Sequence, residues 1–186
     1  MTQTHRQLAQ NPNDARGTSP MQGTVCIKRI LPGSVERLWS YLTEADKQAQ
    51  WMGSGIMEPR VGGTVELAFD IAQMTGGETT PDRFKDAECS GVRGVVTCWD
   101  PPKKLSYTWA EGDNPSEVVF DLVPQGSSVE LTVTHRNLTH RSDAVCVACG
   151  WHSHLALLIA HLNGTQHAPF WPMFLGLEKE YEDIIA

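Results

Sequence analysis

Residues 142–164 read SDAVCVACGWHSHLALLIAHLNG, and this pattern predicts the longest helix of the chain. Ser142 and Asp143 are residues that commonly begin a helix, and the pair Asn163-Gly164 is typical of a helix end. Between them, apolar residues recur at steps of three and four, which places them on one face of a helix of roughly five turns. These residues are Ala144, Ala148, Trp151, Leu155, Leu158 and Leu162. Such a stripe must pack against a large apolar surface.

The preceding residues predict a β-sheet that would supply this surface. Residues 24–31 are β-branched and largely apolar, and Val65, Leu67 and Phe69 alternate with polar neighbours. Turn sequences rich in Pro, Gly, Asn and Asp separate the later strands, and such short connections favour an antiparallel arrangement. The further strands are expected at 93–99, 105–109, 117–123 and 129–135.

Two helices are expected after the first strand. Ser34 can cap a helix that carries Val35, Leu38, Trp39 and Leu42, and Thr43 with Asp46 resembles the start of a second, short helix that ends at Trp51. The last segment, residues 170–185, contains Pro172 and Gly176 early and is predicted to be helical mainly from Leu177 onward.

Composition limits the classes of function. Residues 1–22 are polar without apolar periodicity and are expected to form a disordered tail, so that residues 23–186 make one domain. The net charge is -7, and the 15 Lys and Arg residues are scattered, which argues against nucleic acid as a partner. The chain has no run of eighteen apolar residues and no apolar segment near Met1, so neither a membrane span nor a secretory signal is expected. The five cysteines are then expected to be free thiols, and the compartment the cytoplasm.

Several short motifs carry a resemblance to a known family. They are Ile30-Leu31-Pro32-Gly33-Ser34-Val35-Glu36-Arg37-Leu38-Trp39, Leu42-Thr43 followed by Trp51, Val61-Gly62-Gly63, Trp99-Asp100-Pro101-Pro102-Lys103-Lys104-Leu105, Tyr107-Thr108-Trp109, Leu131-Thr132-Val133-Thr134-His135, and Gly150-Trp151 with Leu155. Their order, from about Val25 to Tyr181, resembles the START-like (SRPBCC) superfamily, and within it the activator of heat-shock protein 90 ATPase homologue family. The stretch from Asp70 to Gly91 is longer and more polar than that pattern. The resemblance implies an α+β helix-grip fold, a curved antiparallel sheet around a long C-terminal helix.

The resemblance further implies a cavity between the long helix and the concave face of the sheet. Strand parity and the helical stripe then indicate which side chains line it, although the same side chains could instead fill the interior completely. Trp51 belongs either to the mouth of this cavity or to the core. The predicted ligand-binding residues are Trp51, Phe69, Tyr107, Trp109, Phe120, Val133, His135, Trp151, His154 and Leu158.

Histidines and cysteines near the stripe raise two alternatives. His135 and His154 could act as general acid or base, but no carboxylate or nucleophile has a spacing that would orient them, and no catalytic residue is assigned. Cys146 and Cys149, followed by His152 and His154, suggest a metal or redox site. A redox pair belongs at a helix N-terminus, and helical geometry turns both cysteines away from the Trp151 stripe. No second cysteine pair exists, so neither a metal nor a cofactor is expected.

The sequence therefore predicts a protein that binds a small apolar or amphipathic molecule and is compatible with a homodimer. Two other classes remain open at this point. One is a cyclase- or hydrolase-like enzyme that uses the pocket histidines. The other is a stress-related co-chaperone with a heat-shock ATPase as partner, which the lack of a preceding chaperone-binding domain disfavours.

Overall fold

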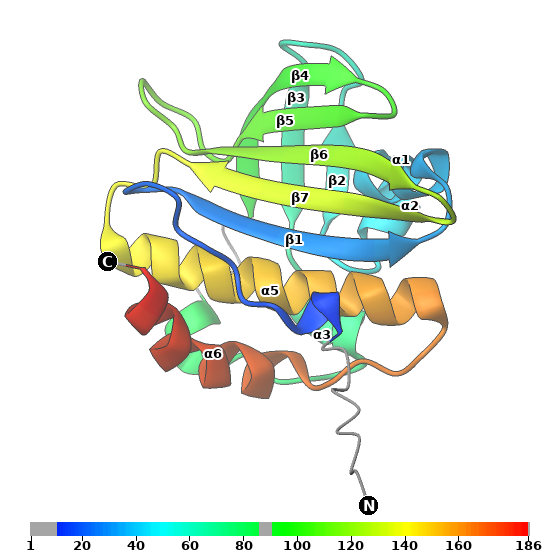
Figure 1. The fold of residues 1–186 in the computed structure, drawn as a ribbon. Helices are drawn as coiled ribbons and strands as arrows, with labels where there is room; N and C mark the ends of the chain where they lie inside the picture. The colour runs from blue at the N-terminus through cyan, green and yellow to red at the C-terminus, as the bar shows by residue number, and fades with distance from the viewer. Residues whose placement is uncertain (1–10, 86–90, 186) are drawn as a thin grey trace, which may run out of the picture.

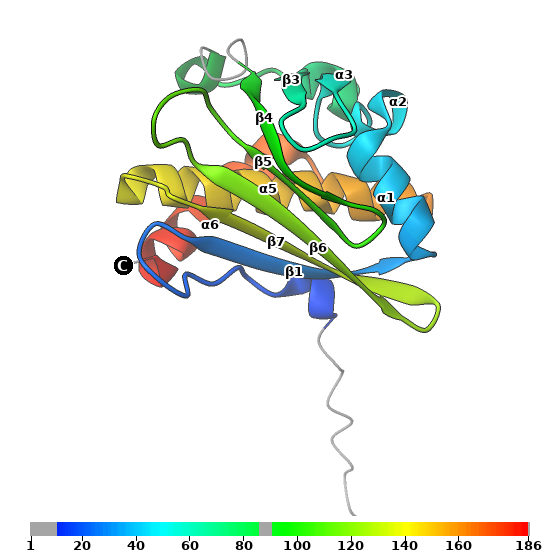
Figure 2. The same cartoon turned by 90° about the horizontal axis from the view of Figure 1, so that it is seen from above.

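A computed structural model describes residues 11–85 and 91–185, and it contains one curved antiparallel sheet (Figures 1 and 2). The sheet has seven strands in the order β1-β7-β6-β5-β4-β3-β2, and every neighbouring pair is antiparallel. The strands are β1 Val25–Pro32, β2 Ser54–Met57, β3 Thr64–Ala68, β4 Val92–Asp100, β5 Lys104–Thr108, β6 Glu117–Gln125 and β7 Ser128–Arg136. The predicted α+β class with a curved antiparallel sheet is confirmed.

The long helix α5, Arg141–Asn163, lies against the apolar face of this sheet (Figure 1). Alternate residues of β1 and β7 are buried on this face, as period-two alternation requires. Trp151 of α5 contacts Phe120 of β6, with ring centroids 5.5 Å apart, and its indole donates a hydrogen bond to His135 of β7. The helix ends at Gly164, which has the left-handed backbone typical of a helix C-terminus. The predicted rod and its contact with the sheet are thus both present.

A second helix, α6 Phe170–Ile184, packs along α5 on the side away from the sheet (Figure 1). It begins at Phe170 rather than near Leu177, so the predicted start is wrong. Pro172 lies in its first turn, where main-chain N–H groups have no partner within the helix, and proline is tolerated there. Because α6 covers α5, Cys149 is fully buried rather than on a free surface. The sequence pattern of α5 contained no sign of this second partner.

The connections between these elements partly match the prediction. Helix α1, Val35–Thr43, is capped by Ser34, whose Oγ accepts the N–H of Arg37. Helix α2, Ala45–Gln48, ends three residues before Trp51, and Thr43 does not cap it, because its hydroxyl donates to the Trp39 carbonyl within α1. Strand β2 and helix α3, Ile71–Thr75, were not predicted. Two short 3-10 helices, η1 Pro12–Asp14 and η2 Asp82–Phe84, complete the described elements.

Residues 11–22 differ from the disordered tail that the sequence analysis expected. The amide of Asn13 exchanges two hydrogen bonds with the main chain of Ile30, at 2.9 and 2.7 Å. Thr18 pairs with Cys26, and the N–H of Gly17 donates to the Tyr181 hydroxyl at 3.0 Å. Strand β1 is at the edge of the sheet, where its unpaired main-chain groups need partners, and this segment supplies some of them. Residues 1–10, the rest of the predicted tail, lie outside the described part of the chain.

Helix α5 is long and apolar enough to cross a membrane by length and composition alone. In the structure, 61% of its most apolar window is buried inside the protein. This is the burial of a core helix in a soluble protein, so the helix gives no support for a membrane span.

Candidate functional site

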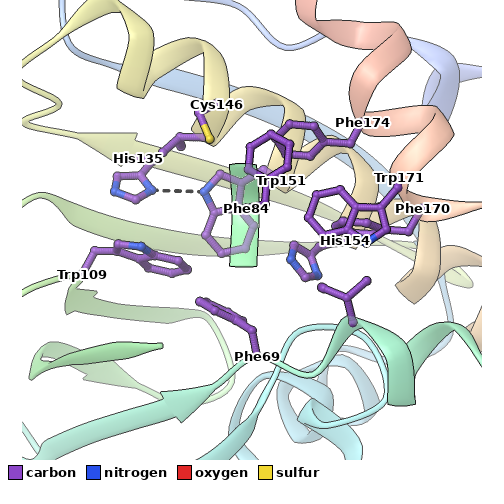
Figure 3. Close-up of a pocket in the computed structure, with 13 residues that line it drawn as sticks. Phe69, Phe84, Trp109, His135, Cys146, Trp151, His154, Phe170, Trp171 and Phe174 are labelled. Atoms are coloured by element: carbon purple, nitrogen blue, oxygen red, sulfur yellow. Dashed lines mark hydrogen bonds between the residues drawn. The ribbon is translucent and has the colours of Figure 1, made fainter. Parts of the chain in front are cut away.

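A pocket of about 180 Å³ lies between α5, α6 and the segment that joins β3 to η2 (Figure 3). Its walls come from α3, η2, the ends of β5 and β7, one side of α5 and the first turns of α6. The lining residues are Phe69, Ile71, Phe84, Trp109, His135, Cys146, Val147, Gly150, Trp151, His154, Phe170, Trp171 and Phe174. Aromatic rings therefore dominate the wall, and none of these residues carries a carboxylate, ammonium or guanidinium group.

The structure brings together five of the ten residues that the sequence analysis proposed for a ligand site. They are Phe69, Trp109, His135, Trp151 and His154. Trp109 follows the end of β5, Phe69 follows the end of β3, and their rings stack with centroids 6.0 Å apart. The pocket therefore lies at one end of the interface between sheet and helix, not along its whole length.

The other five proposed residues are buried beside this pocket and do not line it. Trp51, Tyr107, Phe120, Val133 and Leu158 are each at most 1% exposed and belong to the core. For Trp51 the core alternative is the one observed, since its indole N–H donates to the Tyr41 carbonyl at 2.9 Å. Strand parity places a side chain on the correct face of the sheet, but it does not say where along the strand the packing leaves a space.

The other eight lining residues were not predicted from the sequence to belong to a ligand site. They are Ile71, Phe84, Cys146, Val147, Gly150, Phe170, Trp171 and Phe174. Phe84 packs on Trp171 and Phe174, with ring centroids 5.0 and 4.9 Å apart, so a polar loop and a C-terminal helix meet through these rings. The spacing Phe170, Trp171 and Phe174 marks one face of a helix and was the one available signal.

His135 is held in the pocket wall by both of its ring nitrogens. The Trp151 indole donates to Nδ1 at 3.1 Å, so Nδ1 accepts and the proton of the neutral ring is on Nε2, which then donates to the Ser116 hydroxyl at 3.0 Å. Burial lowers the pKa of His135 from 6.5 to about 4, and donation by Trp151 to Nδ1 acts in the same direction. His135 is thus a neutral, fully used structural ring.

His154 uses only one nitrogen. Its Nδ1 is 2.7 Å from the carbonyl oxygen of Trp51, and a carbonyl can only accept, so Nδ1 carries the proton. Burial lowers the pKa of His154 to about 4, although the hydrogen bond to the Trp51 carbonyl acts in the opposite direction. The ring is therefore neutral at physiological pH, and Nε2 has no hydrogen-bond partner among the described residues.

The cysteines of α5 do not resemble a metal or redox site. Cys146 lines the pocket and Cys149 is buried, and burial raises the pKa of both thiols, that of Cys149 to about 12. His152 is engaged with the Tyr181 hydroxyl at 2.9 Å. Over residues 11–85 and 91–185, no group of three or more His, Cys, Asp or Glu side chains is arranged to hold a metal ion. The four cysteines in this part of the chain are free thiols, as expected, and Cys89 lies outside it.

A curved antiparallel sheet that holds a long helix, with an aromatic pocket at one end of their interface, defines the START-like (SRPBCC) class of helix-grip proteins. The family model described as "Activator of Hsp90 ATPase homolog 1-like protein" matches residues 32–163, and the chain belongs to this family. The family resemblance seen in the sequence is thereby confirmed.

Solved structures are similar over most of the chain. A protein of Bordetella parapertussis is 35% identical, with 90% of each chain covered and a TM-score of 0.74. CalU16 from Micromonospora echinospora is 18% identical over 87% of this chain and 88% of that one, with a TM-score of 0.67. The Aha1 dimer from Colwellia psychrerythraea is 21% identical over 75% and 95%, with a TM-score of 0.57. The last two likenesses concern the fold alone. No curated protein matches the chain.

Proposed function

We propose that residues 23–186 form one ligand-binding domain that takes up a small apolar or amphipathic molecule in the aromatic pocket. The observation that carries this proposal is a space of about 180 Å³ with a mainly aromatic wall, next to the cluster of buried apolar side chains that forms the core. The wall of this space is mainly apolar, and an apolar molecule that covers the wall removes it from contact with water, which is favourable. A ligand that binds only the folded protein also increases its stability, so binding and stability increase together.

The same lining argues against catalysis. His135 has both nitrogens engaged, and neither a carboxylate nor a hydroxyl stands among the thirteen lining residues to act with His154. Acid–base chemistry near neutral pH also needs a group whose pKa lies near that range, whereas the pKa of each pocket histidine is about 4. We therefore favour a binding protein over a cyclase- or hydrolase-like enzyme.

Gly150 offers a direct test of the pocket. It lines the cavity from the middle of α5, and a Cβ at this position would meet only Phe174, at 3.9 Å. Gly150→Leu should fill the space with its own side chain, and it also replaces a glycine in a helix by a better helix former. We expect this variant to fold normally and to lose binding of toluene, measured by calorimetry.

Gly150→Ala is the matched control and should still bind toluene. A Gly150→Leu protein that binds toluene as well as the wild type would show that the ligand lies elsewhere. A wild-type protein that takes up neither toluene nor phenol would refute the proposed function itself.

Two further properties belong to this proposal. The family description and the dimeric Aha1 relative support a homodimer and, as a second candidate function, a stress-related co-chaperone role. If this protein stimulates a purified heat-shock ATPase and the Gly150→Leu variant does not, the co-chaperone role depends on the ligand pocket. If micromolar protein gives no stimulation, the co-chaperone role is refuted. The free thiols support the cytoplasm as the compartment.

A further inference from the structure

We infer that the pocket selects a small neutral aromatic molecule that carries a hydroxyl or N–H group, and that His154 Nε2 accepts the hydrogen bond from this group. The inference rests on the proposed function and adds the chemical class of the ligand. It depends on the tautomer of His154, on the space in front of its ring and on the composition of the wall.

The tautomer follows from the contact with Trp51. Because the Trp51 carbonyl can only accept, the proton of His154 is on Nδ1 and the lone pair is on Nε2. Nδ1 is the ring nitrogen nearer to the main chain, so this hydrogen bond holds the inner edge of the ring. Nε2 is on the outer edge, away from α5.

His154 lines the pocket, and its ring lies among the aromatic rings of the wall. Figure 3 shows the imidazole between the rings of Phe69 and Phe170, and its centroid is 6.1 and 5.0 Å from theirs. Trp171 also lines the pocket, and its indole Nε1 has no hydrogen-bond partner, but this atom is fully buried and a ligand cannot reach it. In contrast, Nε2 of His154 is not fully buried, and it makes no hydrogen bond to any of the described residues. It is an acceptor that a ligand can reach.

An acceptor inside an apolar wall favours a ligand with a donor. A buried polar group without a hydrogen bond is destabilising, so a ligand that leaves Nε2 unpaired binds less well than one that donates to it. A charged ligand is disfavoured because no lining side chain carries an opposite charge. His135 cannot provide a second contact, since both of its nitrogens are engaged.

The size and shape of the space indicate one or two rings. A closed apolar cavity of about 150 Å³ is known to accommodate benzene, and this pocket, at about 180 Å³, leaves room for a small substituent or a fused five-membered ring. Its walls carry rings at varied tilts, which suits edge-to-face and offset contacts with an aromatic ligand. Phenol and indole are the simplest members of this class.

The test compares phenol with toluene, which has a similar size and no donor, in the wild type and in His154→Asn. Asparagine can still donate to the Trp51 carbonyl from the position of Nδ1, but it has no atom at the position of Nε2. We expect His154→Asn to weaken phenol binding about tenfold and toluene binding less than twofold. His161→Asn, an exposed site on the same helix, is the matched control and should change neither.

Nitrogen NMR of the wild type provides a second measurement that does not depend on any variant. Phenol should shift the ¹⁵N resonance of His154 Nε2 in the direction of an accepted hydrogen bond, and toluene should leave it in place. Equal weakening of phenol and toluene by His154→Asn, or no phenol-specific shift of Nε2, would overturn the inference while leaving the proposed function intact. If neither phenol nor toluene binds the wild type, both the proposed function and the proposed ligand class are wrong.

Discussion

Two buried histidines, His135 and His152, and the partly buried His154 should make the stability of this protein depend strongly on pH. Burial lowers the pKa of each from 6.5 to about 4, and for His152 the nearby charges of Arg29 and Arg16 contribute as well. The unfolded chain therefore takes up a proton at each histidine near pH 6.5, whereas the folded protein does so only near pH 4. The free energy of unfolding is then highest above pH 6.5 and falls as the pH drops from 6.5 to 4.

The size of this effect follows from the three shifts. One pKa unit corresponds to about 1.36 kcal/mol, so three histidines that titrate only in the unfolded state reduce stability by about 3 kcal/mol between pH 6 and pH 5. This is a large part of the roughly 5–15 kcal/mol that stabilises a typical domain. The carboxylates of Glu58, Glu117 and Glu180, whose pKa values are lowered from 4.5, lose their stabilising effect only at lower pH.

Urea unfolding followed by tryptophan fluorescence at pH 8, 7, 6 and 5 measures the effect through linear extrapolation. His135→Gln should reduce the loss between pH 6 and pH 5 by about one third, because one of three titrating groups is removed. His161→Gln, at an exposed position of α5, controls for the substitution itself. A loss below about 1 kcal/mol over this interval in the wild type would refute the reasoning, as would an NMR titration that places these buried rings near pH 6.5.

Two substitution pairs test the packing of the sheet and the helices by urea unfolding. Gly94→Ala in β4 should destabilise the protein by about 2 kcal/mol or more, because its Cβ would collide with the Thr108 carbonyl. Gly176→Ala in α6, where the space is open, should stabilise the protein by about 0.5–1 kcal/mol. Equal effects at both sites would contradict this packing. Leu155→Ala, at a fully buried position of α5, should lower the free energy of unfolding by about 2–5 kcal/mol. Leu175→Ala, at a position of α6 that is 39% exposed, should lower it by less than about 1 kcal/mol. A similarly small effect of Leu155→Ala would mean that α5 does not pack against the sheet.

Much of the fold could be predicted from local pattern. The step of three and four through Trp151 and Leu155 specifies a helix with one apolar face, and period-two alternation specifies the strands, because both periods reflect the geometry of a single element. Ser34 as a cap and Gly164 as a helix end were recognisable for the same reason, since capping involves only neighbouring residues. The resemblance to the family then predicted how the strands and the long helix pack together.

The pocket could be predicted only in part. Phe69, Trp109, His135, Trp151 and His154 lie on the faces that periodicity assigns to the interior, and they were found. The opposite wall was not found. Phe84 comes from a polar segment without a clear pattern, and the early Pro172 obscured the helical spacing of Phe170, Trp171 and Phe174.

The amino-acid order alone was sufficient for the class of fold, the long helix and the apolar character of its surroundings, because each depends on contacts within a few residues or on composition. The location of the hollow, the burial of Cys149 and the single free nitrogen of His154 required the folded chain. These features arise where α6, the segment around η2 and the residues after α2 meet α5, and no local sequence pattern encodes how closely such distant segments approach.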